Sequence, residues 1–341
     1  MEKEINVLVT LELSEVARAR LNDITSEVQL SIIPADDPED IPDEQWEKVN
    51  VLYTQGILPN PEKTPNLQWV QFQSAGIDPF LVHPLMQKKD LKATTMSGAI
   101  NSQIAEYVLM AILSFGHKLP LLSRYQREQK WPTEEEKGQV FMPLELRHST
   151  VGILGYGSIG RQLARLLKSF GATILATKHD VMHPEDNGYF PEGMGDPHGD
   201  YFDRLYPVEA LHSLLGKSDF VVVALPQTSD TEHLLENKAF EAMKESAYLI
   251  NVSRGAVVDQ AALVGALQSK KIAGAALDVF EEEPLPADSP LWEMDNVILS
   301  PHIAGLSRSL EAETLTLFIE NLNRSLTDLP LYNMIDKTLG Y

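Results

Sequence analysis

Arg254, Glu283 and His302 each come shortly after an apolar run that is typical of a buried strand. A guanidinium can bind a carboxylate through two parallel hydrogen bonds and polarise an adjacent carbonyl. A histidine can give or take a hydroxyl proton near neutral pH, and a neighbouring carboxylate holds its ring in one tautomer. If the three side chains meet, they can bind an organic acid and move a proton on its oxygen.

Each of these residues also has a simpler interpretation. Arg254 could be a surface residue at the start of a helix, and Glu283 lies in a run of three glutamates that is by default a solvated charge cluster. His302 could be a hydrogen-bonded core histidine. Their coincidence at the ends of three strands favours the chemical interpretation, because a parallel sheet brings such ends to one edge.

A glycine motif at residues 151–160 predicts the elements that would position these side chains. Residues 151–154 predict a buried strand, and the residues after the glycine turn predict a helix with one apolar face. Gly155 allows a tight turn, Gly157 lets a pyrophosphate approach the backbone, and Gly160 lets helix and strand pack closely. The motif favours a bound dinucleotide over a glycine-rich turn without a ligand. A dinucleotide beside the three polar side chains is what hydride transfer to or from a 2-hydroxy acid requires.

Composition limits the class of protein. At 341 residues, two domains are the default expectation. The formal net charge of −21 argues against nucleic acid or an anionic membrane as a partner. The absence of cysteine excludes disulfides, thiol catalysis and cysteine-ligated metals. The first residues lack the regions of a signal peptide, and no run reaches the roughly 18 apolar residues of a membrane span, so we expect a cytoplasmic protein.

The order of the predicted elements indicates an α/β protein with two domains. A long apolar helix from Ser102 would bridge them, and an amphipathic helix over 307–326 would return to the first. We expect a Rossmann doubly wound parallel sheet, the cofactor domain at 102–305, inserted into a flavodoxin-like substrate domain at 1–101 and 306–341. The strands expected in the substrate domain are 5–10, 28–33, 51–54, 67–72 and 93–97. Those expected in the cofactor domain are 151–154, 173–176, 219–225, 247–252, 273–279 and 296–300.

The connection 180–204, between the second and third strands of the cofactor domain, is long and rich in Gly, Pro, Asp and His. We expect either a functional flap or a mobile loop. His183 and His198 could indicate a metal site, but they lack a fixed helical spacing, so no metal is expected.

The chain resembles the D-isomer-specific 2-hydroxyacid dehydrogenase family, the group of glyoxylate/hydroxypyruvate reductases, D-lactate dehydrogenases and phosphoglycerate dehydrogenases. The resemblance implies an NAD(P)-dependent oxidoreductase acting on the CH–OH group of donors, and a homodimer joined through the cofactor domains. The resemblance covers nearly the whole chain, and the matching stretches follow one another in the same order as in the family. The last three of these stretches, taken together, are highly specific. The matching stretches are 74–78, 105–109, 151–160, 225–228, 251–255, 278–284 and 300–305.

The resemblance also implies roles for single residues. His302 would be the acid/base, Glu283 its partner, and Arg254 the anchor for the substrate's carboxylate and carbonyl. The backbone N–H groups of Ala75 and Gly76 would hold the carboxylate from the other domain. The implied cofactor-binding positions, among which Asp278 would orient the nicotinamide amide, are Gly155, Tyr156, Gly157, Ser158, Ile159, Gly160, Lys178, His179, Leu225, Pro226, Thr231, Val252, Ser253, Arg254, Asp278, His302, Ala304 and Gly305.

One position departs from the pattern of NAD-preferring relatives, which place Asp after the second strand to accept from the ribose 2′-hydroxyl. Here the chain has Thr177, Lys178 and His179. Lys178 removes the repulsion toward a 2′-phosphate and offers a cation for it, so NADP(H) is expected over NAD(H), which stays possible. In the alternative, Lys178 faces solvent and Asp180 takes the acidic role.

We therefore expect an enzyme that transfers a hydride between NADP(H) or NAD(H) and a small 2-oxo or 2-hydroxy acid of the glyoxylate or hydroxypyruvate type. The alternative is a dinucleotide-sensing, corepressor-like binding protein on the same fold. Formate or phosphite oxidation is disfavoured because no residue specific to those subgroups is found. Tyr53, Gln55, Trp131 and the residues around Leu306 could line the substrate's side chain.

Overall fold

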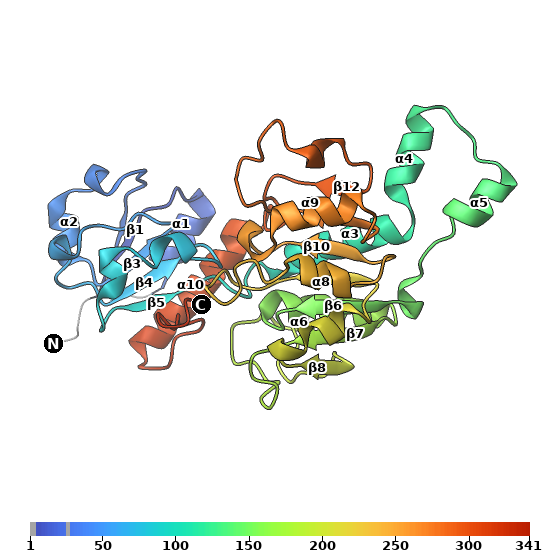
Figure 1. The fold of residues 1–341 in the computed structure, drawn as a ribbon. Helices are drawn as coiled ribbons and strands as arrows, with labels where there is room; N and C mark the ends of the chain where they lie inside the picture. Colours follow the sequence, from blue (N-terminus) through green and yellow to red (C-terminus); the bar gives the residue numbers. More distant parts are fainter. Residues whose placement is uncertain (1–4, 25–27) are drawn as a thin grey trace. The chain divides into compact units, whose positions relative to one another are not determined.

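The computed structural model describes residues 5–24 and 28–341, and the chain divides into two compact units (Figure 1). The first unit comprises residues 1–100, 187–191 and 307–341, and the second comprises residues 101–186 and 192–306. Residues 1–4, part of the start in which the sequence shows no signal-like region, lie outside the described residues.

The first unit is built on a parallel sheet in the order β2-β1-β3-β4-β5, which is the flavodoxin-like order. Ser14 caps the first helix by accepting from the N–H of Ala17. The strands are β1 (Ile5–Val9), β2 (Val28–Ile32), β3 (Val51–Thr54), β4 (Trp69–Phe72) and β5 (Lys92–Thr94). The helices are α1 (Glu15–Asn22), α2 (Asp43–Lys48) and α10 (Leu310–Leu326).

The core of the first unit is completed by helix α10 from the carboxyl-terminal part of the chain. Phe318 of this helix stacks on Tyr53 at 4.3 Å between ring centroids and contacts Trp69 at 5.7 Å. Tyr53 is fully buried among these side chains. The prediction that Tyr53 could line a substrate pocket is therefore wrong, because strand β3 is covered by α10 at this position.

The second unit is built on a seven-stranded parallel sheet in the order β12-β11-β10-β9-β6-β7-β8. The order reverses between β6 and β9, as in a Rossmann fold, so this is the switch point at which ligands of such sheets bind. The strands are β6 (Thr150–Leu154), β7 (Thr173–Thr177), β8 (Arg204–Tyr206), β9 (Phe220–Val223), β10 (Tyr248–Asn251), β11 (Gly274–Leu277) and β12 (Val297–Leu299).

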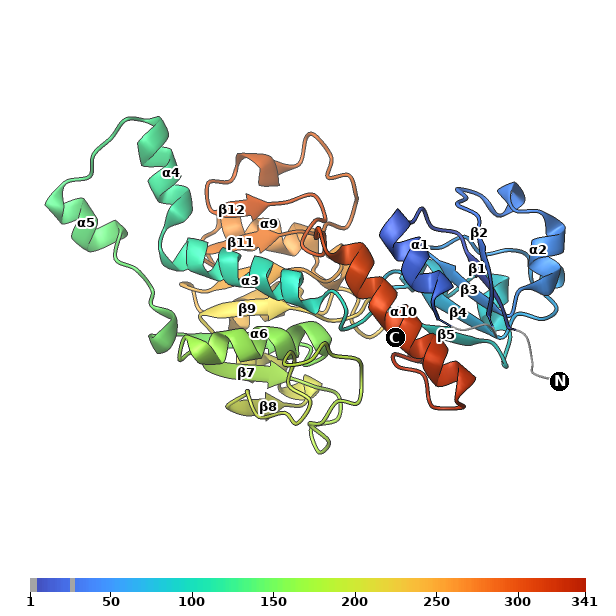
Figure 2. The same cartoon turned by 180° about the vertical axis from the view of Figure 1, so that it is seen from behind.

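Helices cover both faces of this sheet. On one face lie α3 (Asn101–Gly116) and α6 (Ser158–Ser169), side by side (Figure 2). On the other face a single apolar core joins α7 (Leu211–Leu215), α8 (Asn237–Ala242) and α9 (Gln260–Gln268). Two further helices, α4 (Leu119–Arg127) and α5 (Glu134–Val140), extend away from the sheet (Figure 1).

Strand β8 was not expected from the sequence, which predicted six strands in this unit. It pairs with β7, with Arg204 opposite Leu175 and Tyr206 opposite Thr177. The strand is only three residues long and only Tyr206 is buried, so it carries no alternating pattern that could be recognised. The third strand of this unit along the chain is therefore β8 at 204–206, whereas the sequence predicted it at 219–225.

In the part of the chain that the structure describes, no single helix has the length and apolar character to cross a membrane. One bent pair, α3 and α4 at 63°, meets that test by length and composition only.

Candidate active site

The glycine turn between β6 and α6 has the geometry of a phosphate cradle. Gly155 has a φ of +97°, and a Cβ there would lie 2.5 Å from the carbonyl oxygen of Ala224. A Cβ on Gly160 would lie 2.3 Å from the carbonyl oxygen of Gly155, whereas a Cβ on Gly157 would have no atom within 4 Å. Helix α6 begins after Gly157 without a side-chain cap. The turn therefore offers open space beside helix N–H groups, which fits the pyrophosphate of a dinucleotide.

The Gly157→Ala variant is expected to fold normally and to bind the dinucleotide about tenfold or more weakly, because the new methyl group would occupy the open space at the cradle. The measurement is the dissociation constant of NADPH by fluorescence titration, with thermal unfolding alongside. Gly265→Ala is the matched control, since Gly265 in α9 also has no atom within 4 Å of its Cβ position. An unchanged dissociation constant in Gly157→Ala would contradict the assignment of the cradle.

Glu283 and His302 are in direct contact. His302 Nδ1 lies 2.8 Å from Glu283 Oε2, and Glu283 Oε1 accepts from the N–H of Phe280 at 3.0 Å. The carboxylate fixes the ring orientation, so Nε2 is the atom that can exchange a proton with a ligand. The two side chains are 48% and 36% exposed, which leaves the pair accessible. His302 has a left-handed backbone, with a φ of +54°.

Arg254 lies on the segment next to this pair. It follows β10, and its Nη1 donates to the carbonyl oxygen of Ser253 at 2.8 Å. A Cβ on Gly255 would lie 1.9 Å from the carbonyl carbon of Phe280, so the Arg254 segment packs directly on the backbone that leads to Glu283. Strands β10, β11 and β12 are neighbours in the sheet, which brings all three carboxyl ends to one edge.

Asp278 holds the loop that carries His302. Its carboxylate is buried and accepts from the N–H of Ile303 at 2.9 Å and the N–H of Ala304 at 2.8 Å. The hydroxyl of Ser300 also donates to it, at 2.5 Å. The backbone N–H of His302 in turn donates to the Asp278 carbonyl oxygen at 2.8 Å. This role of Asp278 was not predicted from the sequence, and its contact with the nicotinamide amide stays a prediction.

Replacing Asp278 by Asn is expected to lower the free energy of unfolding by about 1–3 kcal/mol, because one amide oxygen cannot accept all of these hydrogen bonds and a buried N–H loses its partner. Urea denaturation measures the change. Tyr107→Phe is the comparison variant. The Tyr107 hydroxyl contacts the Ser300 hydroxyl at 2.6 Å, and Ser300 in turn donates to Asp278, so Tyr107 reaches Asp278 only through Ser300. Its expected cost is about 1 kcal/mol. Equal stability of Asp278→Asn and the native protein would show that Asp278 does not hold the loop.

Lys178 and Asp180 both have partners within the connection after β7. The Lys178 ammonium donates to the backbone carbonyl oxygens of His183 and Glu185. Asp180 Oδ2 lies 2.6 Å from His183 Nδ1, while His179 is exposed. Burial, followed by the charge of a nearby arginine, lowers the pKa of Lys178. Within residues 5–24 and 28–341, no group of three or more His, Asp or Glu side chains could hold a metal ion.

The other predicted cofactor positions in the second unit lie at the carboxyl ends of its strands. Thr231 donates to the carbonyl oxygen of Pro226 at 2.7 Å, which closes the turn after β9. Ala75 and Gly76 belong to the first unit and follow β4. The remaining positions are Leu225 after β9, Val252 and Ser253 after β10, and Ala304 and Gly305 after β12.

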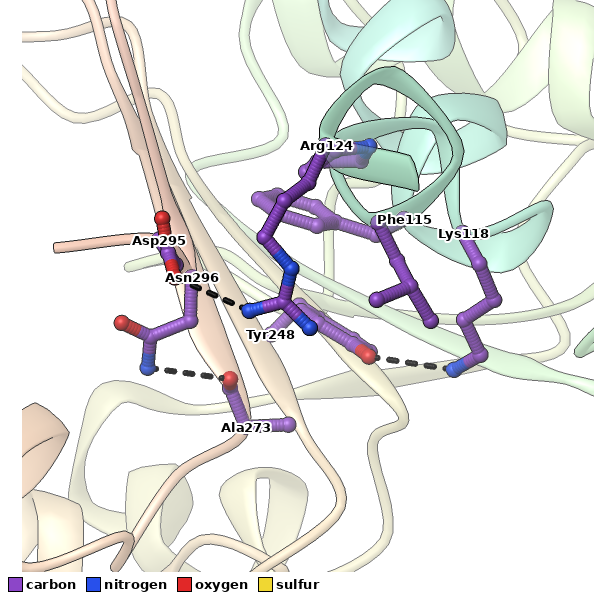
Figure 3. A pocket seen from close by; sticks show the side chains of 9 residues that line it. Phe115, Lys118, Arg124, Tyr248, Ala273, Asp295 and Asn296 are labelled. Atoms are coloured by element: carbon purple, nitrogen blue, oxygen red, sulfur yellow. Dashed lines mark hydrogen bonds and ion pairs between the residues drawn. The ribbon is translucent and has the colours of Figure 1, made fainter. Parts of the chain in front are cut away.

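A small pocket lies at the opposite, amino edge of the second sheet (Figure 3). Tyr248 begins β10, and Asn296 directly precedes β12. Lys118 contacts the Tyr248 hydroxyl at 3.3 Å, and Arg124 pairs with Asp295 at 3.0 Å (Figure 3). None of the side chains that line it is a predicted catalytic or cofactor residue, so this pocket is separate from the candidate active site.

Comparison with known proteins gives consistent matches. The family model for the D-isomer specific 2-hydroxyacid dehydrogenase, NAD binding domain, matches residues 109–304. A glyoxylate reductase of Korarchaeum cryptofilum is 34% identical over 263 residues, 76% of this chain and 74% of that protein. An (S)-sulfolactate dehydrogenase of Chromohalobacter salexigens is 32% identical over 77% of this chain and 78% of that protein. A crystal structure of a D-isomer specific 2-hydroxyacid dehydrogenase from Xanthobacter autotrophicus Py2, in complex with NADPH and MES, is 28% identical with a TM-score of 0.79, covering 99% of this chain and 100% of that one.

Proposed function

Because the chain belongs to the D-isomer specific 2-hydroxyacid dehydrogenase family and is an NAD(P)-dependent enzyme, we propose that it reduces a small 2-oxo acid of the glyoxylate or hydroxypyruvate type. The observation that carries this proposal is the 2.8 Å contact between His302 and Glu283 at the sheet edge that also bears the glycine turn. The similarity to a glyoxylate reductase supports the substrate class.

Different side chains are proposed to transfer the proton, to orient the histidine ring and to bind the substrate's carboxylate. A nicotinamide cofactor, when bound, would supply the hydride that C2 of the acid accepts. His302 gives a proton from Nε2 to the carbonyl oxygen as it becomes a hydroxyl, and Glu283 stabilises the ring in the required orientation. Arg254 binds the substrate's carboxylate and polarises its carbonyl. The backbone N–H groups of Ala75 and Gly76 are proposed to bind the same carboxylate.

We propose NADP(H) as the preferred cofactor, with NAD(H) as a weaker one. Lys178 stands where an acidic side chain would repel a 2′-phosphate. The crystal structure of the Xanthobacter autotrophicus relative holds NADPH, which supports this choice. The ratio of kcat/KM for NADPH and NADH tests it, and a clear preference for NADH would contradict it.

A panel of 2-oxo acids, followed by the loss of NADPH absorbance, tests the proposed activity. We expect turnover of at least one among glyoxylate, hydroxypyruvate, pyruvate and bulkier acids. Consumption of NADPH with none of them, together with measurable NADPH binding, would favour the dinucleotide-sensing alternative.

We also propose a cytoplasmic homodimer joined through the cofactor units. Helices α4 and α5 with the turn between them support it, because they expose Leu119, Leu122, Trp131 and Val140. Light scattering at several protein concentrations distinguishes a dimer from a monomer.

A further inference from the structure

Arg161 is a fully buried arginine in the first turn of α6, directly after the glycine motif. Its Nη1 and Nη2 donate to the backbone carbonyl oxygens of Asp196 and Pro184, each at 2.5 Å. Its Nε lies 3.1 Å from the carboxylate of Asp186. A buried guanidinium needs charged or polar partners, and here both hydrogen bonds and the ion pair come from the connection between β7 and β8. Its Cζ also lies 4.8 Å from the centroid of the Tyr156 ring.

The same short stretch of that connection also binds Lys178. The Lys178 ammonium donates to the carbonyl oxygens of His183 and Glu185, whereas Arg161 binds Pro184 and Asp186. Consecutive residues of the 183–186 segment are thus bound alternately by the two cations. The 183–186 segment therefore contacts both Lys178 and Arg161.

Further contacts fix the connection to the glycine turn. The Tyr156 hydroxyl donates to Asp196 Oδ2 at 2.5 Å, and the N–H of Gly195 donates to Gln162 Oε1 at 2.8 Å. The N–H of Asp186 donates to the carbonyl oxygen of Pro197 at 3.0 Å, which ties the two arms of the connection together. These contacts attach two parts of the connection, residues 183–186 and 195–197, to the glycine turn and to helix α6.

We propose that Arg161 is a positioning residue for dinucleotide preference, which acts by holding the 183–186 segment so that this segment places the Lys178 ammonium for a 2′-phosphate. An ammonium has three donors. Two bonds to fixed carbonyls define its position, and the third donor serves a phosphate oxygen, so the cation is oriented before the cofactor binds. The inference rests on the proposed role of Lys178 in NADP(H) binding.

The test is a double-mutant cycle on dinucleotide affinity, which needs no substrate. Dissociation constants of NADPH and NADH are measured by fluorescence titration for the native protein, Arg161→Gln, Lys178→Ala and the double variant. We expect Lys178→Ala to reduce the preference for NADPH about tenfold or more. We expect Arg161→Gln to reduce it about 3- to 30-fold, and to have no further effect on the preference when Lys178 is already alanine.

Lys168→Gln is the matched control on the same helix. Lys168 pairs with Asp203 at 3.2 Å, so it also contacts the connection, but at the end that directly precedes β8. We expect the NADPH preference to stay unchanged in this variant. If Arg161→Gln does not fold, Arg161→Lys keeps the charge and loses the forked geometry, and we expect a smaller loss of preference in the same direction.

The outcomes distinguish the role of Arg161 from the proposed role of Lys178 in NADP(H) binding. An unchanged preference in Lys178→Ala would overturn both the role of Lys178 and the inference. A loss of preference in Lys178→Ala without one in the Arg161 variants would overturn the inference alone. Equal weakening of NADPH and NADH by Arg161→Gln, or an undiminished effect in the Lys178→Ala background, would show that Arg161 has only a structural role.

Discussion

Replacing His302 by alanine is expected to lower kcat about 100- to 10,000-fold, because the variant has no group at this place that can give a proton to the carbonyl oxygen. The affinity for NADPH is expected to change far less than kcat, because the glycine turn and most of the other implied cofactor-binding positions are untouched. Steady-state consumption of NADPH measures the first effect, and fluorescence titration measures the second.

His233→Ala is the matched control for this experiment. His233 Nε2 lies 3.0 Å from Glu281 Oε1, and this histidine–carboxylate pair has nearly the same exposure as the pair of His302 and Glu283. We expect this variant to keep kcat within about threefold, because the proposed proton transfer belongs to His302. Undiminished turnover in His302→Ala, or a larger loss in His233→Ala, would assign the proton transfer to another group.

The Arg254→Gln variant is expected to lose about 10- to 150-fold in kcat/KM for the 2-oxo acid, mainly through a higher KM. Glutamine keeps a hydrogen-bond donor but removes the charge and the fork that hold a carboxylate. The kcat/KM of Arg254→Lys is expected to lie between those of the native protein and Arg254→Gln, since an ammonium keeps the charge but cannot form the two parallel hydrogen bonds. A variant with an unchanged KM for the acid but a raised KM for NADPH would place Arg254 at the cofactor instead.

Sequence patterns predicted those elements whose apolar or glycine residues recur at a characteristic spacing. The three glycines of the motif each meet a different steric condition, and the positions of Gly155 and Gly160 against backbone oxygens are those that the motif requires. The family resemblance is confirmed by the family model and by the curated relatives. Strand β8 was missed because a short edge strand buries too few side chains to show a period.

The missed residues are those whose roles depend on contacts distant in the sequence. Asp278 binds a loop 25 residues further on, and Arg161 binds carbonyls 23 and 35 residues further on. Every residue has a backbone carbonyl, so residue types do not show which carbonyls will accept a hydrogen bond from a distant side chain. An arginine in an amphipathic helix is expected to lie on the surface. Tyr53 was misplaced for a related reason, since the helix that covers it lies more than 250 residues away.

Transfer of deuterium from the cofactor to the substrate is the most direct test of whether this protein reduces 2-oxo acids by hydride transfer. The protein is incubated with NADPH carrying deuterium at both C4 positions of the nicotinamide ring and with the 2-oxo acid that it consumes fastest. The product is analysed by NMR and chiral chromatography. We predict a 2-hydroxy acid with the deuterium at C2, as the D isomer where the acid has a stereocentre there, formed at a rate that His302→Ala lowers about 100- to 10,000-fold. A product without deuterium at C2, or no 2-hydroxy acid from any 2-oxo acid, would contradict it.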